Sequence, residues 1–225
     1  MKCTQAFIEE YEFFTDFDGT ITSIDSTEAM INTYGNEAVL IIEERFLAGK
    51  VNNRESMVDV YRMMNLTQEM YNNVLHSIKI DPGFAHFCAA LKAAGGDITV
   101  VTGSAIEGVR NYLHSNGIDD LTIRGNKMEA QDGIIVFYCA DEIEDTHCIE
   151  ADCAQCKSKW LIRAREQGKK VLYIGDGVTD RCAANYTDIL FAKHSLARYC
   201  EENDIPFIRY NDFYDIYRYL FEKAE

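Results

Sequence analysis

Two pairs of carboxylates stand out in this sequence because each pair follows a short apolar run. Asp16 and Asp18 lie in the segment DFDGT, and Asp176 and Asp180 lie in the segment GDGVTD. Carboxylates gathered at one place repel one another unless a cation lies among them. Mg²⁺ suits such a place, because it is a hard cation that takes oxygen ligands and keeps several waters. These segments therefore predict a magnesium site with Asp16, Asp18, Asp176 and Asp180 as candidate ligands.

A hydroxyl-bearing segment and a lysine complete the candidate chemistry. Thr102, Gly103 and Ser104 come at the end of a third apolar run, and Lys157 begins a segment with helical spacing. A carboxylate beside Mg²⁺ and a lysine can attack a phosphoryl group, since the metal and the ammonium reduce the repulsion between two anions. Together these residue types indicate phosphoryl chemistry.

The three apolar runs are predicted to be strands that bring these groups to one edge of a sheet. Residues 11–15, 98–102 and 170–174 are short and apolar, which is typical of buried strands. In an open parallel sheet, chemistry collects in the crevice at the carboxyl ends of the strands. The predicted fold class is therefore α/β, with a Rossmann-like parallel sheet flanked by helices.

Further segments fit the same architecture. The sequence predicts two shorter strands at 189–192 and 206–209 and a hairpin within 121–138. It predicts helices at 84–94, 106–114, 157–167, 196–202 and 213–223.

The segment after the first strand differs from the rest of the chain. Apolar residues over 36–80 recur at helical spacing with few strand signals, which predicts a bundle of three or four helices. Pro82 and Gly83 then break the chain. We therefore expect an α/β core of residues 1–23 and 82–225 and a helical cap of residues 24–81.

Composition narrows the classes of function. The 225 residues are 47% hydrophobic and 26% charged, as expected for a folded globular protein, and the net charge of -15 disfavours nucleic acid and anionic membranes as partners. The N-terminal residues lack the pattern of a secretion signal, and no apolar run is long enough to span a membrane. We expect a cytoplasmic protein whose eight cysteines are mostly reduced.

The four polar segments, in this order, resemble the four motifs of the haloacid dehalogenase (HAD) superfamily. The helical segment after the first motif resembles the C1 cap of its phosphoserine phosphatase-like branch. This resemblance implies a Mg²⁺-dependent phosphomonoesterase that acts on a small phosphorylated metabolite through an aspartyl-phosphate intermediate. Alternatives are a phosphoryl transferase or mutase and, in a different class, a non-catalytic binding module.

The resemblance also implies a role for each site residue. Asp16 would be the nucleophile and a metal ligand, and Asp18 the general acid and base, with its backbone carbonyl as a further metal ligand. Lys157 would neutralise developing charge. Asp176 would bind the metal, and Asp180 would orient the groups around it.

The same resemblance places Thr102, Gly103 and Ser104 at the phosphoryl oxygens. Within the branch, the chain resembles the 2-hydroxy-3-keto-5-methylthiopentenyl-1-phosphate phosphatases of methionine salvage. The shared features are the segment CAQCK at 153–157, the segment GDGVTD and the C-terminal tail. Phosphoserine is the weaker substrate candidate, because it lacks a secure arginine partner in this sequence.

Three assignments stay open at this point. Lys159 could take the place of Lys157, because both lie in the first turn of the predicted helix. Asp25 either binds a substrate amine, as the resemblance implies, or caps a helix. A cluster of one histidine and three cysteines either binds Zn²⁺ or is a loop of reduced thiols; its members are His147, Cys148, Cys153 and Cys156.

Overall fold

The computed structural model describes residues 4–139 and 153–222, and a sheet of seven strands runs through the described part of the chain. The strand order is β4-β3-β2-β1-β5-β6-β7, and all neighbours are parallel except β3 and β4. The strands are β1 (Tyr11–Thr15), β2 (Ile98–Ala105), β3 (Thr122–Gln131), β4 (Ile134–Tyr138), β5 (Lys170–Gly175), β6 (Ile189–Ala192) and β7 (Ile208–Arg209).

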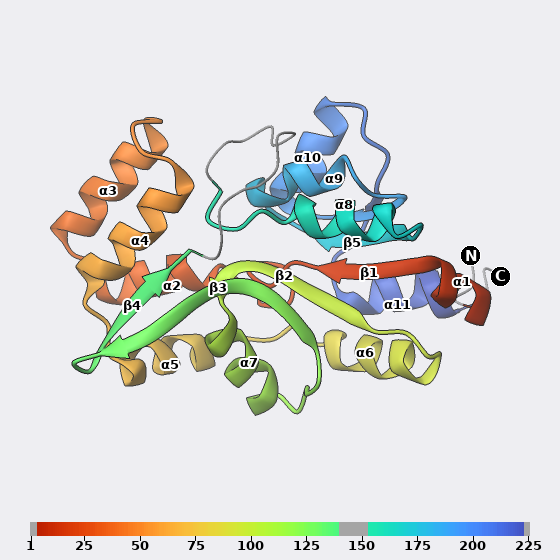
Figure 1. Cartoon of the computed structure of the whole chain (residues 1–225), viewed down its shortest axis with the longest axis horizontal. Coiled ribbons are helices and arrows are strands. Elements are labelled where there is room, and N and C mark those ends of the chain that lie inside the picture. The colour runs from red at the N-terminus through yellow and green to blue at the C-terminus, as the bar shows by residue number, and fades with distance from the viewer. Residues whose placement is uncertain (1–3, 140–152, 223–225) are drawn as a thin grey trace.

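Helices cover both faces of this sheet (Figure 1). The helices are α1 (Gln5–Glu10), α2 (Ser26–Tyr34), α3 (Glu37–Leu47), α4 (Asn53–Met64), α5 (Gln68–Ser77), α6 (Phe84–Ala93), α7 (Ile106–Ser115), α8 (Ser158–Glu166), α9 (Arg181–Ala184), α10 (His194–Glu202) and α11 (Phe213–Phe221), with a 3₁₀ turn η1 (Val178–Asp180) before α9. Among the described residues, no helix has the length and apolar character that crossing a bilayer requires.

The central strand β1 shows why this sequence forms a doubly covered sheet. Phe13 packs into the core shared with α6, α7 and α11, whereas its neighbour Phe14 packs into the core beneath α8, α9 and α10. Successive side chains of a strand point to opposite faces, so a strand between two helical layers must be apolar on both. The predicted α/β fold class is confirmed.

The segment between β1 and α6 forms four helices, as the apolar spacing predicted, and they stand at the end of the molecule towards which β1 points (Figure 1). Each of these helices begins after a capping residue, whose side chain accepts a hydrogen bond from a backbone amide in the first turn of the helix. The capping residues are Asp25, Asn36, Asn52 and Thr67. The division of the chain into a core and a cap domain stays a prediction.

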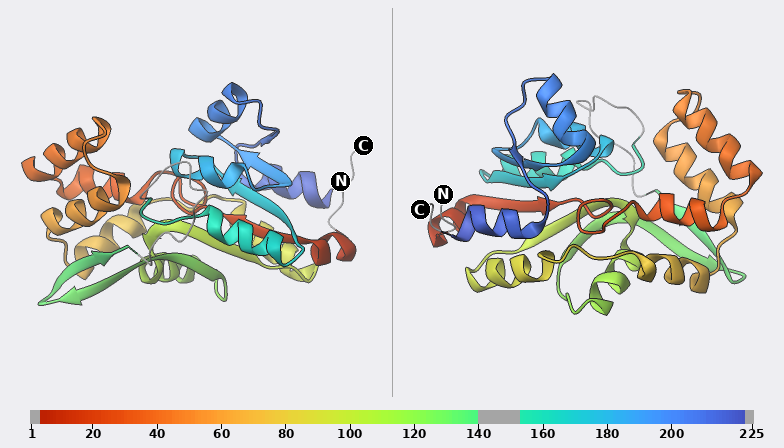
Figure 2. Two further views of the ribbon diagram at one scale, coloured as in Figure 1. Left: turned by 45° about the horizontal axis from the view of Figure 1, so that its top comes forward. Right: turned by 180° about the vertical axis from the view of Figure 1, so that it is seen from behind.

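The β3–β4 hairpin ties the helical segment to the sheet (Figure 2). Its turn consists of Asp132 and Gly133, both with positive φ, as a tight hairpin turn requires. From β4, Phe137 stacks on Tyr61 of α4 with ring centroids 4.6 Å apart. The backbone amide of Ile135 also donates to the carbonyl of Leu66, over 2.8 Å. The predicted hairpin is confirmed. Its packing against α4 was not predicted from the sequence.

One boundary differs from the sequence-based expectation. The second strand was expected to end at Thr102, but β2 continues to Ala105, with an irregularity in its pairing to β3 between Val101 and Ala105. Gly103 and Ser104 therefore belong to an irregular strand end rather than to a loop. Such irregularities re-aim side chains near the rim of a sheet.

Candidate active site

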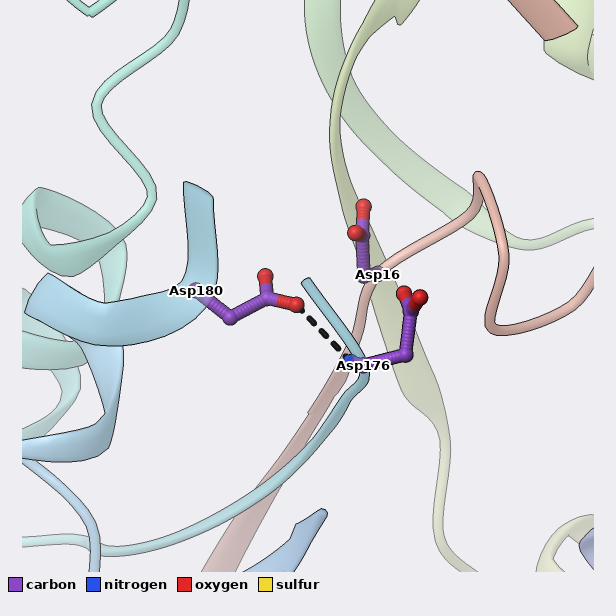
Figure 3. A group of neighbouring side chains, drawn as sticks. All are labelled: Asp16, Asp176 and Asp180. Carbon is purple, nitrogen blue, oxygen red and sulfur yellow. Dashed lines mark hydrogen bonds between the residues drawn. The ribbon is translucent and has the colours of Figure 1, made fainter. Parts of the chain in front are cut away.

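Three carboxylates meet at the carboxyl ends of two paired strands (Figure 3). Thr15 of β1 pairs with Ile174 of β5, so Asp16 and Asp176 follow neighbouring strand ends. Asp180 reaches the same place from η1, and one carboxylate oxygen from each of the three residues lies within 4.8 Å of the other two. The parallel pairing of β1 and β5 thus brings together side chains that are 160 positions apart in the sequence (Asp16 and Asp176).

Lys157 joins two of these carboxylates. Its buried Nζ lies 2.7 Å from Oδ2 of Asp16 and 2.7 Å from Oδ1 of Asp180, and it also donates to Oγ1 of Thr179 over 3.0 Å. Burial alone would lower the pKa of Lys157, but the charges of Asp16 and Asp180 raise it above its ordinary value. Lys157 is therefore a fixed positive charge in contact with Asp16.

Asp180 holds the loop between β5 and α9. Its Oδ1 accepts from Lys157 and, over 2.6 Å, from the hydroxyl of Tyr173. Its Oδ2 accepts from the backbone amides of Asp176, over 2.9 Å, and Gly177, over 3.0 Å. Both oxygens are engaged, which agrees with an orienting role better than with a place as a direct metal ligand.

Asp176 is held in place by contacts from two other segments of the chain. Its Oδ1 accepts from the hydroxyl of Thr20 over 2.9 Å, and its Oδ2 lies 3.4 Å from Nδ1 of His194. Gly19 makes this close approach possible, since a Cβ there would lie 2.4 Å from Oδ2 of Asp176, and its φ of +70° suits glycine. Burial and then the charge of Asp180 raise the pKa of Asp176.

The carboxylate of Asp18 has different hydrogen-bond partners from that of Asp16. Its Oδ2 accepts from the hydroxyl of Ser104 over 2.6 Å and lies 3.5 Å from Oγ1 of Thr102. Its Oδ1 accepts from the backbone amide of Ser26, the first residue of α2, over 2.8 Å. Asp16, in contrast, is buried against Lys157, and burial followed by the charge of Asp180 raises the pKa of Asp16 well above its usual range.

A pocket of about 740 Å³ opens above these side chains. From the strand ends, the loops that follow them and the start of α8, it is lined by Asp16, Asp18, Gly103, Ser104, Lys157 and Asp176. Thr102 is fully buried and does not line the pocket. From the helices α2, α3 and α4 it is lined by acidic, amide and apolar side chains. A volume of this size accommodates a small metabolite above a phosphoryl group.

Asp25 caps a helix and also lines the pocket. Its Oδ1 accepts from the backbone amide of Glu28 over 2.9 Å, so it caps α2, and its side chain also lines the pocket. Protein atoms around the Asp25 carboxyl group reduce its hydration, and the negative charge of Asp18 lies nearby. These two effects, in that order, raise the pKa of Asp25 to about 7. The cap role is shown by this contact, whereas binding of a substrate amine stays a prediction.

Lys159, the alternative to Lys157, does not line the pocket, and the histidine and cysteine cluster is described only in part. Lys159 points away from the carboxylates, with its Nζ 5.2 Å from the ring centroid of Trp160. Of the histidine and cysteine cluster, His147 and Cys148 lie outside the described residues, and Cys156 is buried with its Sγ 3.3 Å from the hydroxyl of Ser158. The zinc hypothesis therefore stays a prediction.

Several residues of the site were not singled out from the sequence. Thr20 and Thr179 lie inside the two aspartate motifs, but the sequence did not show that Thr20 contacts Asp176 or that Thr179 contacts Lys157. The contacts of Ser26, Tyr173 and His194 with the carboxylates join separate segments. Such contacts depend on how segments pack, and no local pattern predicts them.

Comparison with known proteins agrees with this geometry. A family model described as haloacid dehalogenase-like hydrolase matches residues 13–185. A 2-hydroxy-3-keto-5-methylthiopentenyl-1-phosphate phosphatase of Brevibacillus brevis is 26% identical over 209 residues, covering 92% of this chain and 93% of the relative. A polyol phosphate phosphatase of Saccharomyces cerevisiae is 29% identical, covering 90% of this chain and 89% of the relative.

Solved structures show the same fold at lower sequence identity. A phosphoserine phosphatase, solved as a phospho-aspartyl intermediate analogue, matches with a TM-score of 0.66 and 18% identity over 94% of this chain and 98% of that chain. The family match spans 173 of the 225 residues, from the first strand to the helix after the fourth motif. The chain therefore belongs to the haloacid dehalogenase-like hydrolases.

Proposed function

We propose that this protein is a Mg²⁺-dependent phosphatase that hydrolyses a small-molecule phosphomonoester through an aspartyl-phosphate intermediate. The observation that carries the proposal is the contact of Asp16 with Lys157 at the floor of the pocket, with Asp18 two residues away in a different hydrogen-bonding surrounding. Two carboxylates in different surroundings suit two different roles in one reaction. The two relatives described above are both named phosphatases, which supports the same reaction type.

In the first half-reaction, Asp16 forms a bond to phosphorus as the bond from phosphorus to the leaving oxygen breaks. Asp18, protonated at this stage, gives its proton to that oxygen, and the alcohol leaves. Lys157 offsets the negative charge that develops on the phosphoryl group. The amide of Gly103 and the hydroxyl of Thr102 are the candidate donors to the phosphoryl oxygens, because the one hydroxyl proton of Ser104 is donated to Asp18.

In the second half-reaction, Asp18 takes a proton from water, and the water oxygen attacks phosphorus. The bond from phosphorus to Asp16 breaks, which returns the Asp16 carboxylate and releases inorganic phosphate. The hydroxyl of Ser104 and the amide of Ser26 hold the two oxygens of Asp18 in place for both proton transfers.

The residues present fit a magnesium ion. Asp16 and Asp176 are close carboxylates whose raised pKa values reflect burial and negative charge that lack sufficient cationic compensation. They would hold the ion, with the backbone carbonyl of Asp18 as a further candidate ligand, while Asp180 keeps the loop of Asp176 in place. When bound, Mg²⁺ supplies positive charge that lets an anionic nucleophile approach an anionic phosphoryl group.

The substrate class we favour is a small phosphorylated metabolite, such as the methylthio-enediol phosphate of methionine salvage. Apolar side chains from the helices line the pocket beside the polar ones, namely Ile31, Phe46, Met57 and Val60. This mixture suits a leaving group with both hydroxyl and apolar parts. A phosphoserine-like substrate is the second candidate, supported by the fold of the solved relatives.

The test is phosphate release from p-nitrophenyl phosphate with and without Mg²⁺. Asp16→Asn should lower kcat by at least ~10³-fold, because the amide is a poor nucleophile. Asp97→Asn, an exposed substitution outside the pocket, is the matched control and should keep wild-type activity. Wild-type activity in Asp16→Asn, or equal rates with EDTA and with Mg²⁺, would contradict the proposal.

Transfer to an acceptor other than water is the alternative reaction. It is tested by adding glycerol or glucose to the same assay. Unchanged release of inorganic phosphate supports hydrolysis, whereas a fall in inorganic phosphate with an equal gain of sugar or glycerol phosphate would show a transferase.

A further inference from the structure

The charges on the wall of the pocket are distributed unevenly. Among the described residues, Lys157 is the one Lys or Arg that lines the pocket, and it is already in contact with Asp16 and Asp180. His194 lines the rim beside Asp176. The part of the pocket that a leaving group would occupy therefore offers no arginine or lysine of its own.

That same part carries three acidic side chains outside the catalytic motifs. Asp25 and Glu28 come from the start of α2, and Glu43, which is half-buried, comes from α3. The charge of a half-buried carboxylate is screened less by salt than that of a fully exposed one. A second anionic group on a substrate would thus face negative charge from two helices.

The arginines of the helical segment do not correct this balance. Arg54 donates to the backbone carbonyl of Cys139 over 3.3 Å, and Arg62 pairs with Asp59 on the outer side of α4. Neither of them lines the pocket, and Arg45 does not line it either. Recognition of a carboxylate or a second phosphate in proteins depends on such cations, above all on arginine.

We propose that the pocket selects phosphomonoesters whose leaving group carries no negative charge, and that Glu28 and Glu43 enforce this selection by repelling a second anion. The inference rests on the proposed phosphatase function and narrows its substrate class. It favours leaving groups of the polyol or thioether-enediol kind. It disfavours leaving groups with a carboxylate, such as that of phosphoserine.

A matched pair of probes isolates the charge. Glycerol 3-phosphate and 3-phosphoglycerate have the same chain length and differ in one terminal group, a hydroxymethyl in the first and a carboxylate in the second. Wild-type protein should show a kcat/KM at least about tenfold higher for glycerol 3-phosphate, because like charges placed together oppose binding. Equal values, or a preference for 3-phosphoglycerate, would overturn the inference.

Two double variants assign the effect to the pocket. Glu28→Gln with Glu43→Gln should narrow the preference to about threefold or less, since the wall loses two charges. Glu37→Gln with Glu44→Gln changes the net charge equally on α3, outside the pocket, and should leave the preference as in wild type. Equal narrowing in both double variants would show an effect of overall charge and would overturn the assignment to Glu28 and Glu43.

A binding measurement separates this inference from the proposed function. The two probes are titrated into Mg²⁺-loaded Asp16→Asn protein by calorimetry, and glycerol 3-phosphate should bind at least about tenfold more tightly. If wild-type protein released no phosphate from p-nitrophenyl phosphate, the proposed function would fail, but the ratio of the two dissociation constants would still decide the inference. A ratio near one would overturn it.

Discussion

Lys157 shows how strongly one side chain of this site depends on its neighbours. It is buried together with Asp16 and Asp180, and it lies 2.7 Å from an oxygen of each. A buried charge is tolerated only when it is paired and hydrogen-bonded, so removal of the lysine leaves two carboxylates without their cation. Function and stability at this position are therefore linked.

Lys157→Met should lower kcat/KM by at least ~10²-fold and, in EDTA, lower the free energy of unfolding by about 3–5 kcal/mol, the usual cost of breaking a buried ion pair. Phosphate release and urea unfolding measure the two effects. Lys159→Met is the matched control two residues away, and it should change the unfolding free energy by less than about 0.5 kcal/mol. Loss of activity in the control but not in Lys157→Met would assign the functional lysine to position 159.

At the scale of elements, the contact between α5 and α7 joins the helical segment to the helices that cover the sheet. Gly108 of α7 faces Tyr71 of α5, and a Cβ at Gly108 would lie 2.2 Å from the hydroxyl oxygen of Tyr71. The Tyr71 ring is fully buried and cannot swing into solvent. The two helices therefore approach as closely as they do because residue 108 has no side chain.

Gly108→Ala tests this close approach. Alanine gains about 1 kcal/mol in helix propensity, but overpacking a buried contact costs about 1–3 kcal/mol, so we expect a net loss of stability. Urea unfolding of the variant measures it. Adding Tyr71→Phe removes the nearest atom and should restore part of the loss. A Gly108→Ala variant as stable as wild type would show that the two helices can move apart with no loss of unfolding free energy. An absence of rescue in the double variant would show that the Tyr71 hydroxyl is not the atom that limits their approach.

Local residue patterns predicted some of the helices and strands but not all of their boundaries and contacts. The strand at 11–15, the hairpin within 121–138 and the helices at 84–94 and 106–114 were predicted from residue types, because turn signals and apolar spacing act within a few residues. The extension of β2 to Ala105 and the stacking of Phe137 on Tyr61 were not predicted. Both depend on pairing and packing between segments far apart in the chain.

At the scale of the whole molecule, the net charge of -15 opposes folding through repulsion among the acidic groups. Between about 10 mM and about 0.1 M salt the Debye length falls from about 30 Å to about 10 Å, which screens most of this repulsion. The same charge also opposes the approach of an anionic substrate, so the cations of the site must act at short range.

Raising KCl from about 10 mM to about 0.1 M should therefore increase the free energy of unfolding by on the order of 1 kcal/mol. Urea unfolding in EDTA measures it, with a higher midpoint and an unchanged slope. NaCl at equal ionic strength should have the same effect. A difference between the two salts, or a loss of stability with salt, would contradict screening as the cause.

The sequence alone determined the motifs, their order and the strands that present them, because these depend on residue type over short stretches. Only the tertiary structure decided that Asp180 is engaged at both oxygens, that Lys157 rather than Lys159 reaches Asp16, and that Glu28 and Glu43 share one pocket wall. The physical reason is that hydrogen bonds and charge pairs act over a few ångströms. Which distant side chains come that close depends on strand register and helix packing, which no local pattern encodes.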